Sequence, residues 1–262
     1  MKLSHIQVTE HRGQGHPAMG RGRFAAVTTL LCLAGLMVAC QSIPEGKTGA
    51  PAEALARRML SAANLNTWND EVRAVEFRFR ESNSYFWDKQ RGLVEFRSDD
   101  LRVLFSKNTF QGIAFEDGER LQGDELKEAI LKANSNFVND AFWLQPAFHI
   151  RSPGTKLYAV DESTLRVTFS SGGVTPGDTY VFHLDESGKI QLMEMWVSII
   201  PIEGADASFH DYSVHEPGVA VARSREVLGF LTIVIDQVKM HTDAKASNER
   251  FAPLFEAYPD LR

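Results

Sequence analysis

The segment FHDYSVHEP, residues 209–217, holds the densest group of side chains that could bind a metal or move a proton. It supplies His210, Asp211, His215 and Glu216. On a strand, residues five apart point to opposite faces, so His210 and His215 would not share a ligand. Asp211 and His215 could share one, but a catalytic zinc needs three protein ligands. We therefore expect a polar strand end followed by a turn, with no metal and no cofactor.

Other reactive residues do not combine into a catalytic set. His183 and Asp185 lie two apart, opposite the apolar side chains of the same stretch, which is typical of a solvated strand face. The run SSGG at residues 170–173 lacks the Gly-x-Ser-x-Gly setting of a nucleophile elbow, and the sequence contains no glycine-rich phosphate loop. Asp140 is more typical of a residue that hydrogen-bonds a turn than of a base. The sequence therefore predicts that the protein is not an enzyme.

Short strands are the elements that would position these side chains. Apolar and polar residues alternate with a period of two, and turn residues separate the stretches. The expected strands are Val75–Phe79, Tyr85–Lys89, Leu93–Arg97, Leu101–Ser106, Phe110–Phe115, Leu165–Phe169, Tyr180–Leu184, Gln191–Ile200, Ser208–Val214 and Val227–Met240. Short spacers make consecutive strands antiparallel neighbours, so a meander is expected.

Two helical stretches interrupt this pattern. One runs from Ala52 to about Leu65, and a second can be capped by Asp124 and carries apolar residues on one face. The order helix, strands, helical insert, strands predicts an α+β fold. We expect a half-open curved antiparallel β-sheet, an incomplete barrel, with the N-terminal helix and the helical insert covering its concave face.

An aromatic insert and two strongly apolar strands indicate what the hollow of such a sheet contains. Phe137, Phe142, Trp143 and Phe148 fall within a short stretch. Two late strands are apolar on both faces: one carries Met193, Met195 and Trp196, and the other carries Leu231, Ile233 and Ile235 on one face and Phe230 and Val234 on the other. A strand of that kind is covered on both faces. These residues could line a cavity for an acyl chain, whose burial is worth ~0.8 kcal/mol per CH₂. The alternative is that they fill the hollow themselves, because aromatic and Met side chains are common in cores.

The N-terminal segment has the features of an export signal. An apolar run of 16 residues, Phe24–Ala39, follows Arg21 and Arg23 and ends at Cys40. That run is short for a membrane span, which needs ~20 residues, and is typical of a signal peptide; a buried helix or a plain membrane anchor is the alternative. Residues 1–39 are thus expected to be removed, with Met19 as a more ordinary start than Met1. Residues 40–51 would form a tether, 52–240 a single domain and 241–262 an unassigned tail.

Composition limits the partners. The chain has 28 basic and 34 acidic residues, and removing residues 1–39 takes away four basic and one acidic residue, so the formal charge moves from −6 to −9. Such an acidic chain is a poor nucleic-acid binder. Its two cysteines would lie in the signal peptide and at the lipid-bearing position, leaving none for a disulfide. A fold of this size must then depend on an ordinary apolar core.

The stretch MVACQS around Cys40 resembles the lipobox of bacterial lipoproteins, in which the cysteine is acylated. The layout behind it, together with NDAFWL (139–144), RSPGT (151–155) and GVTPGDTYVFHLD (173–185), resembles the LolA/LolB-like group of lipoprotein carriers and an uncharacterised subfamily of exported proteins of that type. The resemblance implies a protein held in the cell envelope by acylated Cys40, with an acyl-chain or lipoprotein ligand in its hollow. Gln41 resembles the pattern of lipoproteins sent to the outer membrane, facing the periplasm. A scaffolding lipoprotein that acts through protein contacts is the alternative function.

Overall fold

The computed structural model describes residues 42–170, 177–198 and 202–262. They form one sheet of 13 strands in the order β6-β5-β4-β3-β2-β1-β13-β12-β11-β10-β9-β8-β7, in which every pair is antiparallel. The first half comprises β1 (Ala74–Phe79), β2 (Asn83–Asp88), β3 (Leu93–Ser98), β4 (Leu101–Ser106), β5 (Gly112–Glu116) and β6 (Glu119–Arg120). The second half comprises β7 (Thr155–Ala159), β8 (Thr164–Phe169), β9 (Thr179–Leu184), β10 (Ile190–Trp196), β11 (Ala205–His215), β12 (Val219–Val227) and β13 (Leu231–His241).

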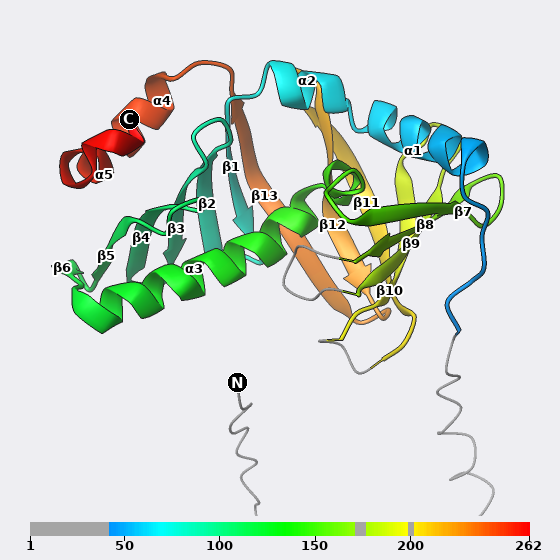
Figure 1. The fold of residues 1–262 in the computed structure, drawn as a ribbon, viewed down its shortest axis with the longest axis horizontal. Helices are drawn as coiled ribbons and strands as arrows, with labels where there is room; N and C mark the ends of the chain where they lie inside the picture. The colour runs from blue at the N-terminus through cyan, green and yellow to red at the C-terminus, as the bar shows by residue number, and fades with distance from the viewer. Residues whose placement is uncertain (1–41, 171–176, 199–201) are drawn as a thin grey trace, which may run out of the picture. The chain divides into compact units, whose positions relative to one another are not determined.

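The two halves are joined by β1 and β13, the one neighbouring pair that is distant in sequence. Both outer strands, β6 and β7, have a single partner strand, so the sheet curves without closing into a barrel (Figure 1). The expected α+β class and half-open antiparallel sheet are therefore confirmed.

A long helix, α3 (Gly123–Leu144), crosses the inner face of the sheet (Figure 1). Its buried residues follow helical spacing, from Ala129 and Ala133 to Phe137 and Ala141. The helix ends because Pro146 follows, and a residue before proline is driven out of the helical region; Gln145 is extended, with φ −157° and ψ 92°. The short 3₁₀ helix η1 (Pro146–His149) comes next. The aromatic insert is thus regular helix up to Leu144.

Helices α1 (Ala50–Ala62) and α2 (Leu65–Asp70) precede the first strand. Leu55, Ala56 and Met59 of α1 are buried in the main core. The chain breaks between these helices at Asn64, whose backbone is left-handed with φ 58°. The single helix expected from Ala52 to Leu65 is therefore two helices that meet at Asn64.

The C-terminal tail covers the outer face of the first half-sheet. It forms α4 (Lys245–Arg250), α5 (Ala252–Ala257) and the 3₁₀ turn η2 (Pro259–Leu261). Phe251, Leu254 and Phe255 pack in a second apolar cluster with the strand residues Ala74, Phe86, Leu93, Leu104 and Ile113. These strand residues alternate with those that face α3, so α3 and the α4–α5 pair lie on opposite sides of the strands (Figure 1). The tail is part of the folded domain.

Several strands differ from those expected: β6, β7 and β12 have no counterpart among the expected strands, and β10 ends at Trp196 where a strand to Ile200 was expected. Val227–Met240 is not one strand: β12 ends at Val227, a turn follows, and β13 begins at Leu231. The short edge strand β7 begins at Thr155, directly after a turn-rich stretch. In addition, the expectation of cover on both faces is wrong at the start of β13, where Leu231 is 38% exposed and the preceding Phe230 is 80% exposed.

Candidate functional site

The candidate site is the apolar interface between α3 and the inner face of the sheet. Within it, Phe137 packs against two rings of β2, at 5.9 Å from Tyr85 and 5.2 Å from Trp87. Phe148 of η1 stacks on Trp68 of α2 at 4.6 Å. The first part of the aromatic insert therefore fits against the protein's own aromatic side chains.

The second part of the insert faces the other half of the sheet. Phe142 lies 4.8 Å from the ring of Tyr180 on β9. Tyr180 pairs across the strands with Met195, and the adjacent Phe182 pairs with Met193. Met193 is 0% and Met195 is 2% exposed. These residues form a continuous apolar inner wall that Phe142 contacts.

The remaining predicted ligand contacts divide between the two faces. Trp143 is 9% exposed and belongs to the main core, with its ring at 6.3 Å from that of Phe142. Trp196 follows Met195 directly on β10, so it lies on the opposite face of the sheet. The structure thus brings Phe142, Met193 and Met195 together, holds Phe137 and Trp143 in the same core, and leaves Trp196 outside it.

A buried carboxylate fastens α3 to the sheet. Asp140, 2% exposed, accepts hydrogen bonds from the Tyr85 hydroxyl at 2.6 Å, the Asn83 amide at 2.9 Å and the Asn139 amide at 2.8 Å. Burial raises the pKa of Asp140, although all three bonds favour the charged form. Burial, with Asp140 close by, also raises the pKa of Tyr85. The sequence indicated a turn for Asp140; it lies instead within α3, four residues before the helix ends, and anchors that end to the sheet.

Sequence reasoning missed a buried cation near the end of α3. Arg225 of β12 is 0% exposed, and its Nη atoms donate to the backbone carbonyls of Ala222 at 2.5 Å and Leu144 at 3.2 Å. Its Nε has no hydrogen-bond partner, and its guanidinium lies 5.2 Å from the Phe209 ring. Burial lowers the pKa of Arg225 to about 10. Its position on a strand with Ala and Ser neighbours gave no sign of burial.

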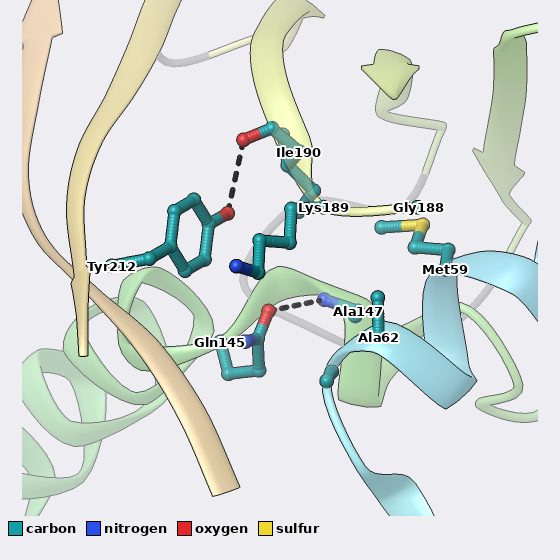
Figure 2. A pocket seen from close by; sticks show the side chains of 9 residues that line it. Met59, Ala62, Gln145, Ala147, Gly188, Lys189, Ile190 and Tyr212 are labelled. Carbon is teal, nitrogen blue, oxygen red and sulfur yellow. Dashed lines mark hydrogen bonds between the residues drawn. The ribbon is translucent and has the colours of Figure 1, made fainter. Parts of the chain in front are cut away.

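A small pocket opens beside this region, between α1, η1 and the β9–β10 turn (Figure 2). Met59, Gln145, Lys189 and Tyr212 are among its lining residues, and its empty volume is about 190 Å³ including open solvent. Tyr212 donates to the carbonyl of Ile190 at 3.0 Å, and Gln145 donates to that of Ala220 at 2.7 Å. The Tyr212 hydroxyl and the Gln145 amide are thus already used in holding the fold together, and the Lys189 ammonium lies 5.6 Å from the centre of the Tyr212 ring.

The polar groups singled out as possible catalysts lie elsewhere. His183 bonds Glu194 at 2.9 Å and Thr164 at 3.3 Å, but the Thr164 hydroxyl is buried and donates to Asp161 at 2.9 Å. That hydroxyl is therefore not placed to attack a substrate. In the segment 209–217, His210 bonds Ser208, His215 bonds Ser213 and Asp211 accepts from Ser224.

Neither a metal-binding cluster nor a membrane-spanning helix is found in the part of the chain that the structure describes. Among residues 42–170, 177–198 and 202–262, no group of three or more His, Cys, Asp or Glu side chains could hold a metal ion. Within the same ranges, no helix combines the length and apolar character needed to cross a bilayer. The signal peptide and the lipidation site expected at Cys40 lie outside the described residues.

Comparison with known proteins finds similarity of fold. No family model and no curated protein matches the chain. A DUF1329 family protein from Desulfovibrio piger is 10% identical with a TM-score of 0.42, over 79% of this chain and 100% of that one. A LolA superfamily protein from Nitrosomonas europaea is 11% identical with a TM-score of 0.32, over 76% and 97%. An outer membrane lipoprotein-sorting protein domain from Vibrio parahaemolyticus is 9% identical with a TM-score of 0.31, over 76% and 99%.

The resemblance to the LolA/LolB-like group is therefore found among solved structures. At these identities it concerns the fold alone. The function has to be derived from this chain's own residues.

Proposed function

We propose that this chain is a lipid-anchored protein of the bacterial cell envelope that holds an acyl chain or another apolar ligand between α3 and the inner face of the sheet. Its role would lie in the handling of lipids or lipoproteins. The observation that supports this is the manner in which α3 covers the sheet. Helix α3 lies over the apolar inner face of the first half-sheet, and it is fastened near its C-terminal end through the buried carboxylate of Asp140.

A buried carboxylate is a costly way to fasten a helix permanently. Removing a charge from water is expensive, and here the three hydrogen-bond donors to Asp140 are neutral groups. A purely apolar contact at this position would hold the helix more firmly. An acyl chain that enters as α3 parts from the sheet would cover the same apolar wall at ~0.8 kcal/mol per buried CH₂.

The anchor would be the acylated thiol of Cys40, in the outer membrane and facing the periplasm. The support is the sequence: an apolar run behind two arginines, small Ala39 before the cysteine, and Gln41 after it. Cys40→Ser should abolish incorporation of labelled palmitate and leave the precursor unprocessed. Equal labelling of the mutant would contradict the proposed anchor.

Trp143 is the residue to change in testing ligand binding. If it lines a space that a ligand enters, Trp143→Ala should weaken binding of a fluorescent acyl-chain probe while the fold survives. Phe110→Ala is the matched control, because Phe110 is 45% exposed on a turn outside the core. The measurement is a probe titration and a denaturant melt on all three proteins.

The scaffolding function is the second candidate, and burial favours it. Met193 and Met195 are almost wholly covered by the protein itself. If the interior is permanently filled, Trp143→Ala should cost ~3–5 kcal/mol of stability, as for a large core truncation. Strong destabilisation together with no probe binding by the wild type would reject the apolar-ligand proposal.

A further inference from the structure

The turn between β12 and β13 presents apolar side chains to solvent in an ordered conformation. Phe230 is 80% exposed and Leu231 is 38% exposed. The Leu228 amide donates to the Asp206 carbonyl at 3.0 Å, and the Phe230 amide donates to the Val227 carbonyl at 3.2 Å. The turn is therefore fixed to its neighbouring strand, and its aromatic side chain is held out from the body.

The segment before α1 is also fixed to the domain. The Lys47 amide and the Ala159 carbonyl bond at 2.8 Å, and the reciprocal Ala159–Lys47 bond has the same length. Arg166 of β8 donates to the Pro44 carbonyl at 2.6 Å. The tether expected over residues 40–51 is thus held to the domain at Pro44, by a side chain of β8, and at Lys47, by a single backbone bridge to β7.

This attachment leaves a short connection to the proposed anchor. Cys40 lies four residues before Pro44, a reach of at most ~14 Å for an extended chain. A bilayer that holds a lipid on Cys40 must therefore lie close to this side of the domain. Ile43, within the connection, is 42% exposed. In Figure 1 the blue segment before α1 runs toward the end of the domain where the β12–β13 turn lies.

We propose that the β12–β13 turn, with Phe230 and Leu231 at its tip, is the surface by which the domain rests on the membrane that carries its own lipid anchor. The partner is a phospholipid bilayer surface, and the inference rests on the proposed lipid attachment at Cys40. Aromatic and aliphatic side chains partition into the interfacial region of a bilayer, and acyl anchoring gains from a second membrane contact. With Phe230 at this surface, the open sheet is held in one orientation to the lipid.

Site-specific labelling tests this orientation. Phe230→Cys and Val214→Cys are made separately in the full lipidated chain, labelled with an environment-sensitive fluorophore and reconstituted into phosphatidylcholine–phosphatidylglycerol vesicles. Val214 is the matched control, because it is 70% exposed on β11, eight residues beyond the turn's partner Asp206, or ~26 Å along the strand. Spin-labelled lipid should quench the label at position 230 at least threefold more strongly than the label at 214. Equal quenching at the two positions would overturn the proposal.

A second arm separates this surface from the anchor. A hexahistidine replaces Cys40 at the start of the mature chain and holds the protein on vesicles that contain a nickel-chelating lipid. Preferential quenching at 230 in this arm supports the surface even if palmitate labelling shows that Cys40 carries no lipid. Equal quenching in this arm, with palmitate on wild-type Cys40, would reject the surface and leave the anchor standing.

Discussion

Replacing Asp140 by Asn should change how the stability of the protein depends on pH. Asp140 is buried between α3 and β2, and burial raises its pKa in the folded protein. The folded protein therefore binds this proton more tightly than the unfolded chain does, in which the pKa of Asp is ~3.9. The stability that Asp140 contributes is fully present below that value and is lost as pH rises through the folded-state pKa.

The expected size follows from proton linkage. One proton changes the free energy of unfolding by at most ~1.4 kcal/mol per pH unit, and each unit of pKa difference is worth ~1.4 kcal/mol in total. Asn cannot ionise, so Asp140→Asn should remove this fall. At acidic pH Asp140 is protonated, so its carboxyl group presents one donor and one acceptor oxygen much as the amide of Asn does, and the two proteins should differ by less than ~1 kcal/mol. Toward pH 7 the wild type should lose stability, and the variant should become the more stable of the two.

Urea unfolding between pH 4 and pH 7.5 measures this difference. Asp161→Asn is the control, since the Ser163 backbone amide, against a smaller effect of burial, lowers the pKa of Asp161. A lowered pKa contributes stability that is present above the unfolded value and is lost as pH falls, which is the opposite sign. Because the Asp161→Asn variant still contains Asp140, its free energy of unfolding should still fall as the pH rises above 4. A constant difference between wild type and Asp140→Asn across the range would refute the reasoning.

Two further predictions concern the arginines. Arg250→Ala should cost ~1–2 kcal/mol in urea unfolding, because it removes hydrogen bonds to buried Glu95 at 2.9 Å and to Glu76 at 3.3 Å. The control Arg97→Ala removes only an exposed partner of Glu95 and should cost under ~1 kcal/mol. Equal costs for the two variants would contradict this prediction. Arg225→Met should change the free energy of unfolding by less than ~1 kcal/mol, since a buried charge is replaced by an apolar side chain of similar length. Arg225→Ala should cost ~3 kcal/mol, because it leaves a cavity. A thermal melt in which the two variants are equally unstable would be inconsistent with this prediction.

The meander was predictable because apolar and polar residues alternate within each of these strands. The strands from β1 to β5 fall within a few residues of the expected ranges, since short turns leave adjacent pairing as the simple topology. The pairing of β1 with β13 was not predictable. It joins residues more than 150 positions apart, and local pattern carries no information about it.

The strand β12 was missed because its composition is not that of a typical buried strand. Small Ala residues and Arg225 occupy buried positions, so the alternation of large apolar and polar residues is weak in this strand. Its backbone nevertheless pairs with β11 along nearly its whole length. Arg225 depends for its burial on the end of α3, which supplies the Leu144 carbonyl. A contact between distant elements of this kind leaves no local signature.

The packing of the C-terminal tail was predictable from the tail's sequence taken together with the pattern of the strands. Phe251, Leu254 and Phe255 recur at helical spacing, which indicates a one-sided apolar helix. Leu93 and Leu104 place single apolar residues, beside Glu95 and Arg102, on the face of β3 and β4 that alternates with the α3 side, and these apolar residues need a cover. Joining the two observations would have placed the tail on the outer face.

The two covers of the first half-sheet differ in a manner that bears on function. On the outer face, Phe251 and Leu254 are fully buried, and Arg250 ties the segment to Glu95 and Glu76. On the inner face, the polar fastening of α3 is a carboxylate held by neutral donors. Loss of the outer cover exposes an apolar surface and buried charges to water, whereas parting of α3 releases a carboxylate to water and exposes an apolar wall that an entering acyl chain would cover. If one side of this sheet yields to a ligand, the energetics therefore favour the side that carries α3.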